Sequence, residues 1–200
     1  HFPLDDQRVH GLLADIYDLH CALMTAFPSD AGRVLFRQEP EQRSPSPEND
    51  ALILVQSQDR PNWDSAALPA PVTADSPKPF QPRFRQNQRL RFRLRGNATV
   101  KKKREGKKNS VRVGLAGEEA QRDWLSRKAE RGGFEVDDCT VIDEGKVTGE
   151  KNGKHHLTFK SVRYEGVLSV REPDNFLETL KQGIGPAKAF GFGLLSVAPA

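Results

Sequence analysis

The segment Arg89–Arg95 reads RLRFRLR, and it constrains the fold more than any other part of the chain. Basic and apolar residues alternate strictly, with Leu90, Phe92 and Leu94 between the arginines. Successive side chains of a β-strand point to opposite faces of a sheet, so this period of two predicts a strand with one buried and one cationic face. The fold must therefore contain a sheet that is half-buried at this strand.

Periodicity and turn residues predict the other elements. Apolar residues recur every three or four positions over Asp15–Phe27, which predicts a helix that Pro28 ends. Further helices are predicted over Glu118–Arg131 and Pro173–Gln182, with at most a short one near Trp63–Leu68. Strands are predicted over Arg33–Gln38, Ala51–Ser57, Phe134–Ile142, Thr158–Val170 and Phe190–Val197, with an exposed loop at 101–108 and a charged connection at 144–154.

The order of these elements matches the split βαβ pattern of the ferredoxin-like fold, used twice. We therefore predict an α+β protein with two tandem ferredoxin-like (RRM-like) domains, over residues 1–85 and 86–200. Sheets of this topology often bind RNA, as the RRM does, but the sequence lacks the aromatic signatures with which the RRM stacks bases.

A basic block from Arg83 to Arg112 interrupts an otherwise acidic chain. It holds 13 Lys and Arg residues and one acid, Glu105, whereas the rest of the chain holds 18 basic and 26 acidic residues. Such a one-sided block favours a polyanionic partner. The alternative is a solvated face or a disordered basic loop.

Composition and cysteine content narrow the class of protein. The mean hydropathy is -0.66, and no run approaches the roughly 18 apolar residues that a membrane span needs. Cys21 and Cys139 are the only cysteines, which indicates neither a disulfide framework nor a zinc knuckle. The start of the chain also lacks the pattern of a signal peptide. We therefore expect a cytoplasmic protein in a reducing compartment, with no membrane partner.

Tyr17 and His20 lie one helical turn apart on the first predicted helix. His20 falls inside the apolar arc of that helix and Tyr17 lies at its edge. One interpretation is a hydrogen-bonded core histidine beside a half-buried tyrosine. The other is a helix that opens onto a site, where an imidazole with an ordinary pKa of about 6.5 is suited to proton transfer. Spacing alone leaves both open.

A second candidate is the segment GIGPAKAFGFGLL, residues 183–195, near the end of the chain. It matches neither the P-loop nor the dinucleotide pattern, because Lys188 stands where the latter needs its third glycine, so we expect no nucleotide cofactor. Its glycines can serve geometry alone, as a helix cap and as close packing for the last strand. They can also let backbone N–H groups approach a phosphate beside the charge of Lys188.

The sequence offers no carboxylate cluster at ligand spacing and only the divergent pair His155 and His156, so we expect no metal site.

Four segments carry a family resemblance when they are taken together and in order. They are DIYDLHCALMTAFP near the start, FRLRGN at 92–97, YEGVL at 164–168 and QGIGPAKAFGFGLLSVAP at the end. With them the chain resembles, over nearly its whole length, the CasE family of CRISPR-associated endoribonucleases of type I-E systems. Members of that family mature the repeat RNA and stay in the Cascade complex.

The resemblance implies two tandem ferredoxin-like domains and cleavage without a metal at the 3′ base of the repeat hairpin. The upstream 2′-hydroxyl attacks its own phosphate, which leaves a 2′,3′-cyclic phosphate and a 5′-hydroxyl. His20 matches the catalytic histidine of the family, Tyr17 its tyrosine and Lys188 the basic residue of its glycine-rich loop. The family also opens with a short strand, and this chain is expected to begin after it.

On this basis we expect His20 to act most readily as general acid, with general base on the 2′-hydroxyl as the alternative. Tyr17 is expected to position the 2′-hydroxyl or a phosphate oxygen, and Lys188 with the loop amides to hold the developing charge on the phosphate. The expected partners are the CRISPR repeat hairpin RNA and the other Cascade subunits, especially the backbone subunit. Residues expected to bind RNA are Gly183, Gly185, Gly191, Gly193, Arg91, Arg93, Arg95, Lys101, Lys102, Lys103, Lys146, Lys151, Lys154 and Lys160. Two other hypotheses are a non-catalytic RNA-binding scaffold subunit and a protein-interaction module whose basic block meets an acidic partner.

Overall fold

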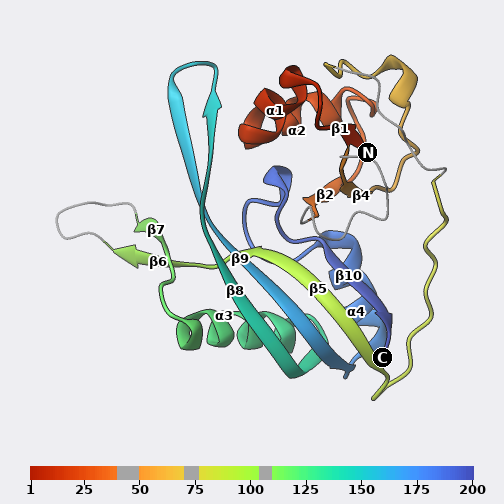
Figure 1. Ribbon diagram of the computed structural model, residues 1–200. Helices are drawn as coiled ribbons and strands as arrows, with labels where there is room; N and C mark the ends of the chain where they lie inside the picture. Colours follow the sequence, from red (N-terminus) through yellow and green to blue (C-terminus); the bar gives the residue numbers. More distant parts are fainter. Residues whose placement is uncertain (40–49, 70–76, 104–109) are drawn as a thin grey trace. The chain divides into compact units, whose positions relative to one another are not determined.

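The computed structural model describes residues 1–39, 50–69, 77–103 and 110–200 (Figure 1). Its residues cluster into two compact units, which are not simple halves of the chain. The N-terminal unit comprises residues 1–81, 148–158 and 188–191, and the C-terminal unit comprises residues 82–147, 159–187 and 192–200.

The C-terminal unit is built on a four-stranded sheet with two helices on one face (Figure 1). In chain order its main elements are β5 (Arg89–Asn97), α3 (Glu118–Arg131), β8 (Phe134–Lys151), β9 (His155–Val170), α4 (Pro173–Gln182) and β10 (Leu195–Pro199). The strands lie in the order β10-β5-β9-β8, and β5 pairs antiparallel with both of its neighbours. A βαββαβ chain with its first strand between its fourth and third is the ferredoxin-like arrangement, so the predicted fold class is confirmed for this unit.

The core of this unit follows from the alternation in RLRFRLR. Leu90, Phe92 and Leu94 are buried in one cluster with apolar residues of α3 and α4. The arginines between them point to the opposite face, as the period of two predicts. Within the core the Trp124 and Tyr164 rings stack with centroids 5.9 Å apart. Burial of this apolar surface is the main term that stabilises the unit.

Two predictions about loops are wrong. Part of the expected loop at 101–108 is strand, because β6 (Thr99–Lys103) pairs antiparallel with β7 (Ser110–Gly114). The rest of that loop lies outside the described residues. The expected connection at 144–154 is also mostly strand, since β8 runs to Lys151 and β9 starts at His155. Charged residues are compatible with strands here because both form exposed two-stranded ribbons, whose side chains face water.

The N-terminal unit has much shorter elements. They are β1 (Phe2–Pro3), α1 (Gln7–Ala14), α2 (Ile16–Met24), β2 (Leu35–Gln38), β3 (Asp50–Ala51), β4 (Ile53–Gln56) and the 3-10 helix η2 (Trp63–Ser65). β3 pairs with β1 and β4 pairs with β2, both antiparallel. One residue separates β3 from β4, so the two act as one interrupted strand that pairs with β1 at its start and with β2 at its end. In a ferredoxin-like sheet the third strand likewise lies between the first and the second.

Two features of this unit correct the sequence predictions. The chain was expected to begin after the opening strand, yet Phe2–Pro3 forms that strand against Ala51 and Asp50. A two-residue strand gives no periodicity for sequence analysis to detect. The predicted helix Asp15–Phe27 is confirmed as α2, but it ends at Met24 and is preceded by a second helix, α1. No helix among the described residues is long and apolar enough to span a membrane.

Candidate functional site

Helix α2 presents Tyr17 and His20 at the edge of its buried face. Ile16, Leu19 and Leu23 are buried, whereas Tyr17 and His20 are only half-buried. Within the described residues the His20 imidazole has an aromatic contact and no hydrogen-bond partner. This position differs from that of a hydrogen-bonded core histidine.

Phe190 joins this helix to the glycine-rich segment. Its ring centroid lies 5.5 Å from that of His20 in an edge-to-face contact and 6.4 Å from that of Tyr17 in a tilted one. Phe190 ends the 3-10 helix η3 (Lys188–Phe190), which Lys188 begins. The three predicted catalytic residues are therefore brought to one place in the N-terminal unit, around an aromatic residue that the sequence analysis did not select. Its position between Lys188 and two closely spaced glycines was the available signal.

Two left-handed backbone positions bracket η3. Ala187, directly before it, has φ +64, which is an uncommon conformation for a residue other than glycine. Gly191, directly after it, has φ +72, and a Cβ added there would lie 3.0 Å from the Phe36 ring. The turn η3 therefore has a left-handed residue at each end. Non-glycine residues in this conformation, such as Ala187, are often found at functional sites.

The other three glycines of the segment have geometric roles in the C-terminal unit. Gly183 ends α4, with φ +74, and its N–H donates to the Thr179 carbonyl. A Cβ on Gly193 would lie 2.6 Å from the Ile184 carbonyl oxygen, and one on Gly185 would lie 2.8 Å from the Trp124 ring. These positions have the capping and close-packing roles that the sequence left open. Phosphate contact by the four glycines stays a prediction.

Local electrostatics distinguish the two aromatic candidates. Half-burial lowers the pKa of His20 below its ordinary 6.5, because desolvation disfavours the charged imidazolium. The pKa of Tyr17 is raised, first by its hydrogen bond with Cys21 one turn later. Tyr17 is therefore a neutral phenol near pH 7, suited to hydrogen bonding. Of the two, His20 is the one suited to proton transfer, and the lowered pKa keeps its imidazole mainly neutral at pH 7 in the absence of RNA.

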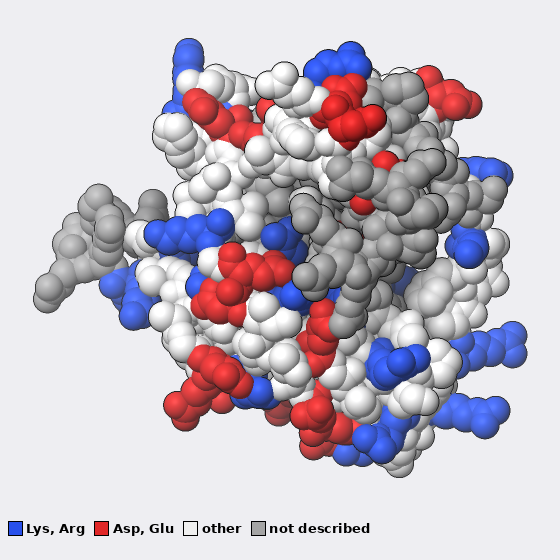
Figure 2. Space-filling model, in the orientation of Figure 1, with Lys and Arg blue, Asp and Glu red and all other residues white. Residues whose placement is uncertain are grey.

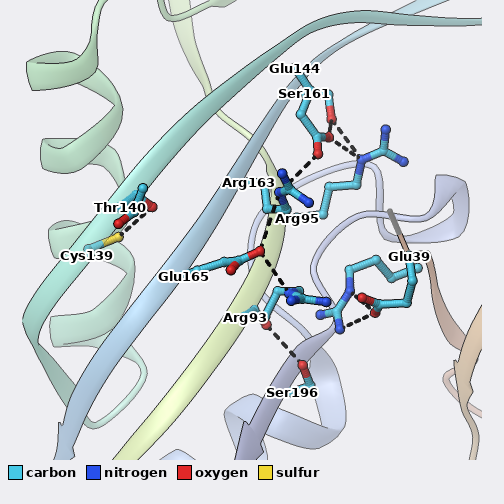
Figure 3. A network of polar contacts seen from close by, with 11 residues as sticks. Glu39, Arg93, Arg95, Cys139, Thr140, Glu144, Ser161, Arg163, Glu165 and Ser196 are labelled. Carbon is cyan, nitrogen blue, oxygen red and sulfur yellow. Dashed lines mark hydrogen bonds and ion pairs between the residues drawn. The ribbon is translucent and has the colours of Figure 1, made fainter. Parts of the chain in front are cut away.

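The arginines of β5 differ in how their charge is matched. Arg93 pairs with Glu165 at 3.0 Å and Arg95 pairs with Glu144 at 2.8 Å (Figure 3). Their side chains are only 16% and 15% exposed. Arg91 is exposed and donates from Nε to the Pro199 carbonyl. Arg93 and Arg95 therefore belong to an internal polar network of the sheet face, and their contact with RNA stays a prediction with less support.

The predicted lysines are mostly at the surface. Lys160 is the exception, because its Nζ lies 2.5 Å from Asp143 Oδ1 and its side chain is only 19% exposed. The exposed lysines of the predicted set are Lys101, Lys102, Lys103, Lys146, Lys151 and Lys154. On the face drawn in Figure 2, the Lys and Arg side chains of the described residues are interspersed with Asp and Glu side chains. No group of three or more His, Cys, Asp or Glu residues within the described residues could hold a metal ion.

Comparisons with known proteins bear on this arrangement. A family model described as CRISPR associated protein matches residues 1–199. The CRISPR-associated endoribonuclease Cse3 of Thermus thermophilus is 36% identical over 203 residues, covering 94% of this chain and 92% of that protein. The CRISPR system Cascade subunit CasE of Escherichia coli is 34% identical, covering 92% of each. A solved structure of the CRISPR endoribonuclease Cse3 bound to a 19 nt RNA has a TM-score of 0.83 at 33% identity, covering 99% of this chain and 97% of that one.

Proposed function

Because the chain belongs to the family of CRISPR-associated proteins that includes Cse3 and CasE, we propose that it is the endoribonuclease that matures CRISPR repeat RNA. It binds the repeat hairpin, cleaves at its 3′ base and stays with the mature RNA in the Cascade complex. There it contacts the other subunits, especially the backbone subunit. It works in the cytoplasm and uses no cofactor.

The observation that carries this proposal is the joint contact of His20 and Tyr17 with Phe190. Through it a proton-transfer group, a phenol and the lysine-bearing turn η3 come together in one unit. Phosphodiester transesterification needs these three kinds of group: one that moves a proton, one that orients a hydroxyl or phosphate oxygen, and one that balances developing negative charge.

In the proposed reaction the 2′-oxygen attacks the adjacent phosphorus and the bond from phosphorus to the 5′-oxygen breaks. The 2′-hydroxyl loses its proton, and the 5′-oxygen gains one. His20 donates that proton as general acid, Tyr17 orients the 2′-hydroxyl or a phosphate oxygen, and Lys188 with the loop amides stabilises the charge on the phosphate. The products are a 2′,3′-cyclic phosphate and a 5′-hydroxyl.

The hairpin is held mainly through its phosphates. The A-form major groove is too narrow for most side chains to read, so charge and shape dominate recognition of an RNA stem. Exposed cations are better placed for this than ion-paired ones. We assign the main phosphate contacts to Arg91 on β5, Lys101, Lys102 and Lys103 on β6, and Lys146, Lys151 and Lys154 on the β8–β9 ribbon.

The test is cleavage of the repeat-hairpin RNA from the protein's own CRISPR locus in excess EDTA. The native protein should cleave it, while His20→Ala and a substrate with one 2′-deoxy at the scissile nucleotide should not be cleaved although binding persists. Loss of one proton-transfer group should slow cleavage by roughly 10²- to 10⁴-fold. Tight binding without cleavage by the native protein would indicate the scaffold function, and unchanged cleavage by His20→Ala would move the chemistry away from this histidine.

The direction of proton transfer is read from the pH profile. A general acid must be protonated, so the single-turnover rate should fall about tenfold per pH unit above the pKa of His20 in the RNA complex. A rate that instead rises with pH and then levels would assign His20 as general base on the 2′-hydroxyl.

A further inference from the structure

The side chain of Asp15 binds two segments that are far apart in sequence. Its Oδ1 accepts from the Tyr17 N–H at 2.8 Å and from the Asp18 N–H at 3.1 Å, which caps α2. Its Oδ2 accepts from the Glu150 N–H of β8 at 2.8 Å. Capping needs only one acceptor atom, so the second oxygen is available to hold the ribbon against the first turn of the helix.

Gly149 makes this contact sterically possible. A Cβ added there would lie 2.9 Å from Asp15 Oδ1 and 2.9 Å from the Tyr17 nitrogen. Gly149 is buried and does not have a positive φ. Space, rather than backbone conformation, therefore excludes a side chain at this position. The strand passes so close to the helix that even a methyl group would displace the N-terminus of α2.

We propose that Asp15 and Gly149 form a latch that positions Tyr17 and His20 for cleavage. The latch fixes the first turn of α2, to which Tyr17 belongs, and His20 follows one turn later. It is made by the segment 148–158, which belongs to the same unit as α2 and carries the exposed Lys151 and Lys154. Asp15 is thus a positioning residue and has no contact with the reacting atoms. The inference rests on the proposed function of His20.

Two substitutions break the latch in different ways. Asp15→Asn keeps an oxygen that can cap α2 but places an amide N–H₂ against the Glu150 N–H, so two donors face each other. Gly149→Ala leaves both hydrogen-bonding partners in place and pushes the strand off the helix. Since a misplacement of about 1 Å can cost roughly a hundredfold in rate, the single-turnover rate at saturating RNA should fall about tenfold to a hundredfold in each variant. The RNA concentration for half-saturation should stay within about twofold.

Gly11→Ala is the matched control. It is the same substitution in the same unit, on helix α1, and its added Cβ meets nothing within 4 Å. Alanine is favoured over glycine inside a helix, so this variant should fold and cleave like the native protein. Native rates in both Asp15→Asn and Gly149→Ala would overturn the latch.

A multiple variant separates positioning from general structural damage. If Asp15 acts through Tyr17 and His20, Asp15→Asn in a background that lacks both groups, Tyr17→Phe with His20→Ala, should be no slower than that background alone. If Asp15→Asn instead slows that background by its full single-variant factor, Asp15 acts independently of both residues and the proposal fails.

Amide hydrogen exchange tests the latch without using activity. In the native protein the Glu150 amide should be protected, and in Asp15→Asn it should exchange faster while the Tyr17 amide stays protected by the remaining cap. Equal exchange of the Glu150 amide in both proteins would show that the latch does not form. A native protein that shows this protection but does not cleave RNA would contradict the proposed function and leave the latch only as a structural contact, which also overturns its positioning role.

Discussion

The two units of the protein differ in how they obtain a stable structure. The C-terminal unit holds the whole of β5 and β10 and most of the long strands β8 and β9, over a core that includes Trp124, Tyr164 and Phe176. In the N-terminal unit, strands β1 to β4 have only two or four residues and the buried cluster is smaller, yet this unit carries His20, Tyr17 and η3. The proposed site therefore lies in the unit with the shorter elements, where we expect single contacts such as those of Phe190 and Asp15 to set the positions of the functional groups.

The largest expected effect lies in the C-terminal core and concerns stability. Leu94 is fully buried under both helices. Leu94→Ala should lower the free energy of unfolding by about 2–5 kcal/mol, measured by denaturant or thermal unfolding. At a temperature where the variant remains folded, its single-turnover cleavage rate should be close to that of the native protein. Loss of cleavage without loss of stability in Leu94→Ala would contradict the view that the C-terminal core supports stability and the N-terminal unit supports cleavage.

The next largest effect should appear at Phe190 and concern rate. Phe190→Ala removes the ring that contacts both His20 and Tyr17, and each aromatic pair is worth about 0.5–1.5 kcal/mol. Freed from this contact, the two side chains should sample unproductive rotamers, and cleavage should slow by about tenfold or more. Phe190→Tyr keeps the ring and should retain most of the rate. Equal rates in the alanine and tyrosine variants would show that the ring does not position the site.

A smaller effect is expected from the exposed lysines of the ribbon tip. If Lys151 and Lys154 each neutralise one phosphate, each alanine variant should lower the slope of log affinity against log salt by about 0.7–0.9. Arg95→Ala is the contrast, because Arg95 is paired with Glu144 and packs on the Phe192 ring. Its loss should reduce stability and leave the salt slope unchanged. A lower salt slope in Arg95→Ala, with unchanged slopes in the two lysine variants, would instead assign the phosphate contact to Arg95.

The smallest expected effect is a pH dependence of stability. The pKa of His20 is lower in the folded protein than its ordinary 6.5, because of burial, so the unfolded chain takes up the proton at a higher pH. The stability that comes from the neutral imidazole is complete above about pH 6.5 and is lost as the pH falls toward the lowered folded-state value. Relative to His20→Gln, whose residue 20 does not titrate, the native protein should therefore have a lower unfolding midpoint at pH 5 than at pH 8. A native midpoint that rises relative to that of His20→Gln as the pH falls would contradict the direction of the shift.

Sequence patterns predicted the large elements well and the small ones poorly. Helices α3 and α4 have the predicted bounds, because Gly132 and Gly183 mark their ends, and β5 follows from its alternation. The strand β1 and the helix α1 were missed, since two residues give no period and Asp15 was read as the start of structure rather than a junction. The final strand begins five residues later than predicted, at Leu195, because Lys188–Phe190 forms a 3-10 turn.

The residues of the candidate site were predictable in part, where a residue type or a motif marks them in the sequence. His20, Tyr17 and Lys188 were selected from residue type and motif, and their catalytic roles stay a prediction. Phe190 was missed because its place between Lys188 and two closely spaced glycines does not show which side chains its ring contacts. The ion pairs of Arg93 and Arg95 were missed because their partners Glu165 and Glu144 lie on other strands, and only the sheet order brings them together.

The central claim is that α2 carries the catalytic group while the C-terminal core supplies stability. Its most direct test compares His20→Gln with Leu94→Ala by thermal unfolding, RNA affinity and single-turnover cleavage in EDTA. His20→Gln should lose cleavage by about 10²-fold or more while its affinity and its unfolding midpoint at pH 7 remain near those of the native protein. Leu94→Ala should show the opposite: a lower unfolding midpoint, and a cleavage rate equal to that of the native protein at temperatures where the variant is still folded. If His20→Gln cleaves at the native rate, or loses cleavage only in proportion to lost folding, the assignment of catalysis to α2 is wrong.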